Sequence, residues 1–278
     1  MSTRIEPVSF LRKASDIASF YGFRPAQSLD QELPRDRRLL ITGARNFDRI
    51  ASACVECLDN RAKKQPGVQL TEALLCYHSN ATPLEVPFGL LPRDIAEFGV
   101  GIVGSQGSIG EIVALKVLFA ILNDQGIKVR AVKIGSGGDK DSQARFAREL
   151  GVYLKKRAGD IAECCHESSA SDPLSILKCR SEGCVAIVSE GPRSMAFLSE
   201  KSRTHFKEVL EYLERAGMFY ELDERHVYDD KMPRVMFSLD LEDGQDFIVK
   251  VSGGRYDDHI RRVTGKKGAT AVRASILF

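Results

Sequence analysis

Apolar residues recur every three or four positions in several segments of the chain, which is the spacing of a helix with one buried face. The pattern predicts helices over residues 11–21, 45–64 and 109–125, a further helix after Asp139 or Asp141, and another around 206–213. Ser108 and Glu111 have the spacing of a capping box at the start of the helix over 109–125. Because that helix is apolar nearly all round, we expect it to be buried.

Short runs of apolar and β-branched residues lie between and after these helices and predict strands. They cover residues 68–77, 98–103, 128–134, 218–222, 234–240, 246–251 and 270–277. The segment 158–184 holds many small, serine and cysteine residues, so we expect it to be rich in loops. Helices between short strands, together with a strand-rich end, predict an α+β fold.

The composition is that of an ordinary globular chain. The 278 residues, of which 43% are apolar and 28% charged, suffice for a full hydrophobic core and suggest roughly two domains at most. This composition excludes a disordered chain, a collagen-like repeat and a disulfide scaffold. The seven cysteines form no paired framework, and we find neither a signal peptide nor a run of about 18 apolar residues. We therefore expect a cytoplasmic protein with no membrane partner.

Charge is distributed unevenly, although the formal net charge is only +2. Basic residues dominate 128–157 and 250–278, and acidic residues dominate 221–246. A net charge near zero argues against a wholesale nucleic-acid binder, but the basic stretch 128–157 could still contact RNA. Solvated faces, or pairing between neighbouring strands of opposite charge, are the favoured explanation of the pattern.

The cysteines suggest two interpretations. Cys54 and Cys57 lie on the apolar stripe of a predicted helix, so we expect buried core thiols rather than a redox pair. A looser group of potential soft ligands consists of Cys164, Cys165, His166, Cys179 and Cys184. Their spacing matches no standard zinc pattern, so we expect no metal site, and metal binding by the four cysteines of this group stays open.

Two glycine-rich stretches, 101–110 and 135–140, each follow a predicted strand and lead into a predicted helix. Backbone N–H groups at such a place could hold an anion. Neither stretch is a GxGxxG or a GxxxxGK[ST] motif, so a tight strand-to-helix turn is the simpler interpretation. Neither a Ser-His-Asp order nor an HExxH motif is present, and the motifs alone therefore define no activity.

The string over Ser252–Asp257, SGGRYD, resembles the GGRYDGL signature of histidyl-tRNA synthetases. Further stretches resemble that family in the same order, namely 15–23, 93–100, 134–154, 162–179 and 219–227. The resemblance implies a class II synthetase core, in which an antiparallel sheet is flanked by helices and carries an inserted smaller α/β domain. It places the core at 1–127 and 218–278 and the insertion at 128–217.

The resemblance also implies site residues. Arg93 falls at the arginine of motif 2 and is a candidate catalytic clamp on a phosphate or carboxylate. The ligand-binding candidates are Glu97, Gly253, Gly254, Arg255 and Tyr256. The residues from Gly253 to Tyr256 have a structural alternative, because glycines allow a strand to approach its neighbours closely.

The sequence departs from the family where amino-acid activation needs charge. Residues 86–89 replace the FRYE-like segment, Glu97 and Gly101 replace Gln and Glu, and 228–233 replace the RGLDYY loop. By this resemblance the motif 3 region, 270–278, ends before the arginine that stacks on ATP, and we expect a protein without the anticodon-binding domain. Removing one charge clamp typically costs about 10²–10³-fold in rate, so loss of several predicts little adenylation.

These departures favour a ligand-binding or regulatory paralogue without full aminoacylation activity, similar in kind to the regulatory subunit of ATP phosphoribosyltransferase. One alternative is a divergent ligase for histidine or another amino acid, which would use ATP and Mg²⁺ with Arg93 and Arg255. Another is an RNA-binding module. The resemblance implies a homodimer, and a protein partner or a tRNA-like RNA on 128–157 is a further expectation.

Overall fold

The computed structural model describes residues 6–33, 35, 47–64, 73–80, 96–179, 181–223, 233–242 and 250–278. One eight-stranded sheet runs through the molecule in the order β1-β2-β3-β8-β7-β6-β4-β5. The strands are β1 Arg24–Pro25, β2 Leu74–Asn80, β3 Glu97–Val103, β4 Val129–Gly135, β5 Tyr220–Leu222, β6 Met236–Leu241, β7 Lys250–Arg255 and β8 Ala271–Leu277. The five inner pairs, β2–β3, β3–β8, β8–β7, β7–β6 and β6–β4, are antiparallel. The two outermost pairs, β1–β2 and β4–β5, are parallel.

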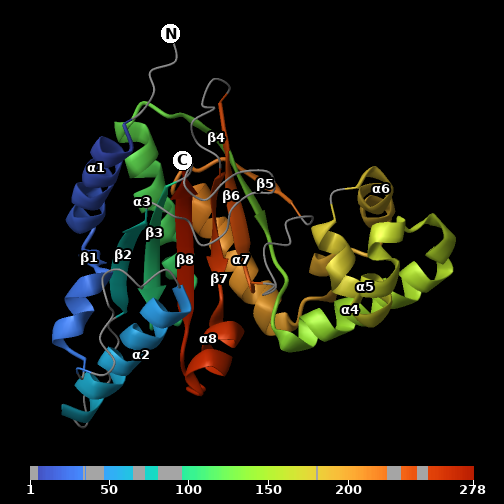
Figure 1. Cartoon of the computed structure of the whole chain (residues 1–278), viewed down its shortest axis with the longest axis horizontal. Helices are drawn as coiled ribbons and strands as arrows, with labels where there is room; N and C mark the ends of the chain where they lie inside the picture. Colours follow the sequence, from blue (N-terminus) through green and yellow to red (C-terminus); the bar gives the residue numbers. More distant parts are fainter. Residues whose placement is uncertain are drawn as a thin grey trace.

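Helices cover both faces of this sheet (Figure 1). The helices are α1 Pro7–Phe20, α2 Phe47–Lys64, α3 Ile109–Asp124, α4 Lys140–Lys156, α5 His166–Ser171, α6 Glu182–Glu190, α7 Glu200–Arg215 and α8 Asp257–Thr264. Helices α1, α3 and α7 pack with one face of the sheet in the main apolar core, and α2 and α8 pack in a second apolar cluster on the other face. The expected α+β class is confirmed, with helices flanking a sheet that is antiparallel except at its two outermost pairs.

Helix α3 lies at the centre of the main core. Its side chains are buried on nearly every side, as the all-round apolar pattern predicts, and Leu115 and Leu118 are fully buried. They meet alternate residues of the strands, such as Val100 of β3 and Ala274 of β8. Alternation along these strands therefore leaves the other set of residues for the opposite face.

The predicted capping box of α3 is wrong. Ser108 has helical backbone angles (φ −71°, ψ −8°), and its hydroxyl donates to Glu208 Oε2 at 2.9 Å. Glu111 turns away from the helix start, toward Arg255 and His205. By contrast, Asp139 caps α4 as expected, because its carboxylate accepts from the Ser142 N–H at 3.0 Å.

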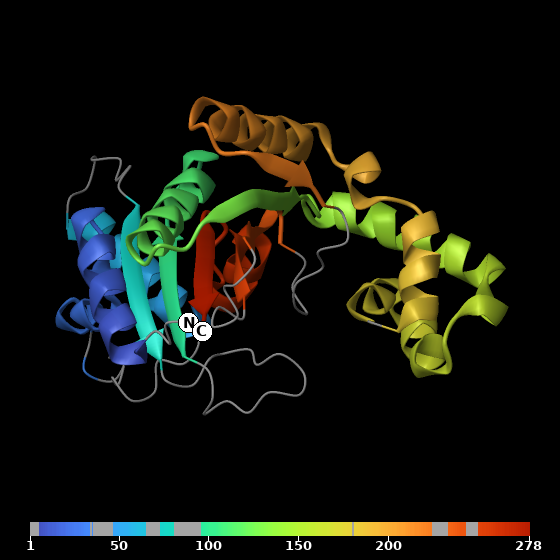
Figure 2. The same cartoon turned by 90° about the horizontal axis from the view of Figure 1, so that it is seen from above.

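Residues 140–197, here called the helical unit, lie to one side of the sheet (Figure 2). The segment 158–184, expected to be rich in loops, instead forms short helices: η4 Ala158–Asp160, η5 Glu163–Cys165, α5, η6 Pro173–Lys178 and the start of α6. The unit ends with the short helix η7 Ser194–Phe197. A separate apolar cluster holds it together, and its buried members are Phe146, Leu150, Leu154, Ile161, Cys165, Ile176, Cys184 and Ile187.

The expected insertion at 128–217 is wider than this unit. Strand β4, near the start of the expected insertion, belongs to the main sheet, and α7, at its end, packs in the main core. The described residues between 140 and 197 form helices joined by short turns and contain no strand. The domain boundary at 128–217 therefore stays a prediction, with the helices at its centre.

The uneven charge is explained in part by pairing between strands. Basic residues of β4 and its start face acidic residues of β6 and its end. Lys128 lies 3.9 Å from Glu242, and Arg130 and Lys133 lie 3.6 and 3.7 Å from Asp240. None of the described helices is long and apolar enough to cross a membrane.

Candidate functional site

The face of the sheet opposite α3 carries a row of small and polar residues. The register places His78, Gly99, Ser275, Ser252 and Ser238 side by side across five strands. The neighbouring row contains Gly101, Arg273 and Gly254. We call these two rows, together with Glu97 at the start of β3, the polar face.

A buried charged group occupies one end of the polar face. Glu97 is fully buried, and its Oε1 accepts a hydrogen bond from Arg273 Nη2 at 2.9 Å. His78 is 5% exposed, and its Nε2 lies 3.7 Å from the same oxygen. Although burial opposes ionisation, the contacts with His78 and Arg273 lower the pKa of Glu97 to about 2. Glu97 is therefore a carboxylate at neutral pH.

Glycine and aromatic residues set this geometry. A Cβ on Gly99 would lie 2.2 Å from His78 Cε1, so the missing side chain leaves the space that the imidazole fills. The ring of Phe47, the first residue of α2, lies 5.7 Å from the Arg273 guanidinium carbon, within cation–π range. His78 Nε2 is buried and has no hydrogen-bond partner within the described part of the chain. A carboxylate, a guanidinium and an imidazole thus lie together, and the imidazole Nε2 lies near the carboxylate without a hydrogen bond to a described residue.

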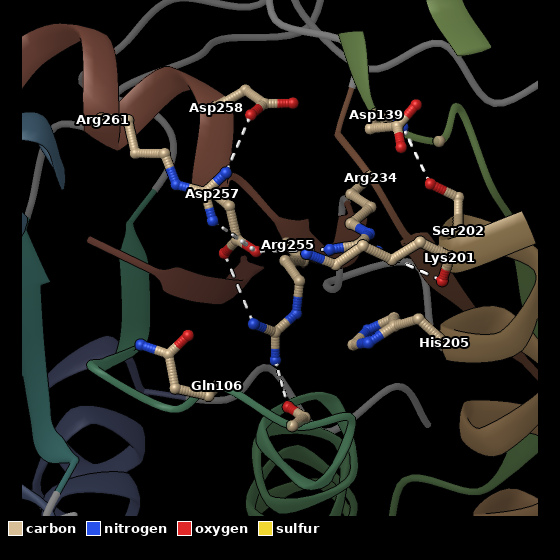
Figure 3. A network of polar contacts seen from close by, with 12 residues as sticks. Gln106, Asp139, Lys201, Ser202, His205, Arg234, Arg255, Asp257, Asp258 and Arg261 are labelled. Carbon is tan, nitrogen blue, oxygen red and sulfur yellow. Dashed lines mark hydrogen bonds and ion pairs between the residues drawn. The ribbon is translucent and has the colours of Figure 1, made fainter. Parts of the chain in front are cut away.

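Arg255 lies on the other face of the sheet, inside the protein (Figure 3). Its Nε and Nη2 donate to Oε1 and Oε2 of Glu111 at 2.8 and 2.7 Å, which is a bidentate ion pair. The remaining donors reach the carbonyl oxygens of Ser105 and Gly107 at 2.9 and 2.5 Å, and Asp257 Oδ1 at 3.4 Å. A guanidinium has five N–H donors, so none remains for a ligand.

The partners of Arg255 extend this network. Burial opposes the charge of Glu111, but Arg255 and His205 lower its pKa, and His205 Nε2 lies 2.7 Å from its Oε1. Burial raises the pKa of Asp257, whose Oδ1 accepts from the Ala271 N–H at 3.1 Å. Strand β7, the turn before α3, and helices α3 and α8 therefore meet at one guanidinium, and α7 joins the network through the contact of His205 with Glu111. This geometry favours a structural role for Arg255.

The two glycines of the resemblance have packing reasons of their own. A Cβ on Gly253 would lie 2.5 Å from the Arg273 carbonyl oxygen, and one on Gly254 would lie 2.5 Å from that of Val235. Tyr256 follows at the start of α8, with its ring centroid 6.4 Å from that of Phe47.

The structure does not bring the predicted site residues together as a set. Glu97 lies on the polar face and Arg255 on the opposite face, and Arg93 lies outside the described residues. The prediction missed His78 and Arg273, the partners of Glu97. Alternation along β8 was the available signal, because it places Arg273 and Ser275 on the face opposite the apolar residues.

The cysteines divide into two groups. Cys54 and Cys57 are fully buried in the α2 cluster, as expected for core thiols. Cys164, Cys165, Cys179 and Cys184 of the helical unit bring their sulfur atoms within 4.8 Å of one another. Among the described residues, these four are the ones whose grouping could hold a metal ion.

The sheet topology and its flanking helices define the molecule as a class II-type core with a helical unit attached. Solved structures of histidyl-tRNA synthetases have the same fold. The S. aureus apo enzyme aligns with a TM-score of 0.63 at 17% identity, covering 98% of this chain and 67% of that one. An ATP phosphoribosyltransferase regulatory subunit/histidyl-tRNA synthetase from Bacillus halodurans aligns with a TM-score of 0.57 at 15% identity, covering 98% and 76%.

Sequence comparison gives the same likeness, although no family model matches the chain. Histidine–tRNA ligase of Clostridium perfringens (strain SM101) is 30% identical over 177 residues, which is 63% of this chain and 42% of the ligase. That of Solibacter usitatus is 26% identical over 229 residues, or 81% and 54%. The chain therefore has a histidyl-tRNA-synthetase-like class II core, and its matches span about half the length of these relatives.

Proposed function

We propose that this protein is a ligand-binding, regulatory relative of the histidyl-tRNA synthetases rather than an aminoacylating enzyme. The observation that carries the proposal is the state of Arg255 in the sheet core, which Glu111 holds in a bidentate ion pair and whose remaining donors also have partners. Activation of a carboxylate by ATP needs cations on the phosphates, and a guanidinium whose five donors all have partners inside the protein serves that need poorly. The replacement of the RGLDYY loop at 228–233 supports the same conclusion.

The polar face suggests the class of ligand. Glu97 is anionic and complements an ammonium group, while Arg273 is cationic and complements a carboxylate. His78 adds a nitrogen that can donate or accept. A free amino acid carries both charges, and the likeness to histidine–tRNA ligases makes histidine the first candidate.

Ligand-induced stabilisation tests this proposal. L-Histidine at about 100 times its Kd should stabilise the protein by about 2.7 kcal/mol, seen as a higher Tm. ATP alone should leave the Tm unchanged. The variant Glu97→Gln should lose the response to histidine, while Glu149→Gln, at an exposed position of α4, should keep it. An equal response in Glu97→Gln, or none in the unmodified protein, would contradict the proposed ligand site.

The regulatory part of the proposal concerns partners. An ATP phosphoribosyl transferase complex from Thermotoga maritima is among the similar structures, with a TM-score of 0.51 at 14% identity. By this likeness we propose a homodimer that binds the catalytic subunit of such a transferase. Analytical ultracentrifugation of the chain, alone and mixed with that subunit, should show a dimer and then a larger species. A monomer that stays unchanged on mixing would contradict this part.

Each of the two alternative functions, a ligase and an RNA-binding module, would need side chains that already contact other residues of the protein. A ligase reaction through Arg255 would require this side chain to leave Glu111 and the two carbonyls that it holds. RNA binding through 128–157 would rely on nine basic residues, of which Lys128, Arg130, Lys133 and Arg157 already face acidic side chains. Both alternatives are therefore less well supported than a small-molecule site.

A further inference from the structure

Four thiols converge in the helical unit from separate short segments. Cys164 and Cys165 end the helix η5, Cys179 directly follows η6, and Cys184 lies in the first turn of α6. Their sulfur atoms all lie within 4.8 Å of one another, with 3.8 Å between Cys164 and Cys165 and 3.6 Å between Cys164 and Cys179. All four are free thiols.

These distances match the coordination shell of one ion. Zinc binds thiolate sulfur at about 2.3 Å in a tetrahedron, which sets the sulfur atoms about 3.8 Å apart. Tetrahedral sites of four sulfurs are typical of zinc, and zinc binds more tightly than ferrous iron at most such sites. We propose that Cys164, Cys165, Cys179 and Cys184 form a structural zinc site in the helical unit.

The surroundings act differently on the sulfurs, because burial raises the pKa of Cys165 whereas Ser181 stabilises a thiolate at Cys179. The Ser181 N–H lies 3.5 Å from Cys179 Sγ, and the Ser181 hydroxyl lies 3.2 Å from it. These contacts lower the pKa of Cys179 to about 6. His166 is not a ligand in this arrangement, because its Nε2 lies 2.6 Å from the Ile161 carbonyl oxygen.

The helical unit has a small core that a metal would reinforce. Its apolar cluster has eight buried members, and two of these are Cys165 and Cys184. The four thiols join segments of only three to nine residues, which are too short to be stable alone. Small structures of this kind are commonly completed by a bound metal. Cys164 is exposed, which leaves the site a route for entry of the ion.

Metal analysis of the full chain tests the proposal. Protein purified from zinc-supplemented cultures should contain about one zinc per chain by plasma mass spectrometry. After removal of zinc by a chelator, Co²⁺ should restore the strong visible bands of a tetrahedral thiolate complex. The double variant Cys164→Ser/Cys179→Ser should contain no zinc, whereas Cys57→Ala, a thiol of the α2 cluster, should retain it.

A second measurement covers the case in which the double variant does not fold. In the unmodified chain, removal of zinc should speed amide hydrogen exchange in 158–190 and leave the exchange of α3 unchanged. Protein that carries neither zinc nor Co²⁺ after reconstitution would overturn the proposal. Stoichiometric iron in place of zinc, or a Cys164–Cys179 disulfide found by peptide mapping of the freshly purified protein, would also overturn it.

Discussion

Replacement of Arg255 by methionine should destabilise the core strongly. The side chain is fully buried and holds together β7, the turn at 105–107, and α3 through Glu111. Methionine fills much of the same volume but offers no donor. Glu111, itself fully buried, would then be left without its bidentate partner.

The magnitude follows from this burial. Removal of one partner of a buried ion pair costs about 3–5 kcal/mol, because the other charge stays buried without compensation. For a chain of this length, each kcal/mol lowers the Tm by about 2 °C, so Arg255→Met should lower it by about 6–10 °C. The double variant Arg255→Met/Glu111→Leu should lose less stability than Arg255→Met. The same backbone carbonyls lose their donors in both variants, but in the double variant no buried carboxylate is left unpaired.

Thermal unfolding followed by circular dichroism measures these differences, with Arg203→Met as a control. Arg203 lies on α7 and is exposed, so its replacement should change the Tm by less than about 1 °C. The reasoning is refuted if Arg255→Met melts within 2 °C (about 1 kcal/mol) of the unmodified protein. It is also refuted if the double variant is less stable than the single one.

Three further variants test other parts of the structure. The lowered pKa of Glu97 contributes stability above pH about 4.5 that is lost as the pH falls toward 2. Glu97→Gln should therefore reduce the loss of unfolding free energy in acid by about 3 kcal/mol. Urea unfolding at acid pH measures this, and a pH dependence equal to that of the unmodified protein would refute the prediction. Gly253→Ala should lower the free energy of unfolding by about 1–3 kcal/mol, because its Cβ would meet the Arg273 carbonyl. Denaturant titration measures this, and an unchanged free energy of unfolding would refute the packing argument. Asp139→Ala should lower the free energy of unfolding by about 1–2 kcal/mol and speed amide hydrogen exchange at the start of α4. Exchange there as slow as in the unmodified chain would contradict the capping role of Asp139.

Periodicity in the sequence predicted the long elements well. Helix α3 was predicted over 109–125 and runs from Ile109 to Asp124, and β8 lies within the predicted 270–277. Local patterns suffice for such elements, because each one buries a face set by its own period. Helix α8 was missed, because half of its eight residues are charged and only Tyr256 separates it from the strand β7.

Contacts between distant residues could not be predicted in the same way. Glu111 has the spacing of a capping residue, but its partner Arg255 lies 144 positions away, and a charged side chain at full burial takes the partner that compensates it. The resemblance identified Glu97 and Arg255 but not the faces that they occupy. Strand register decides this, since one residue of shift reverses the face.

The cysteines illustrate the same limit. A zinc site is usually recognised in a sequence by two pairs of ligands at a short, regular spacing. The spacing of Cys164, Cys165, Cys179 and Cys184 matches none of the common patterns. Short helices, which the sequence did not predict, fold the chain back so that the four sulfurs meet. The grouping is visible only in three dimensions.

Histidine-dependent exchange of pyrophosphate into ATP tests the central claim most directly, because it isolates adenylation from any step on tRNA. The chain, assayed with ATP, Mg²⁺ and saturating L-histidine, should show the same exchange as without histidine, next to an active histidyl-tRNA synthetase as the positive control. Exchange that depends on histidine and approaches the rate of the control enzyme would contradict a ligand-binding, regulatory function.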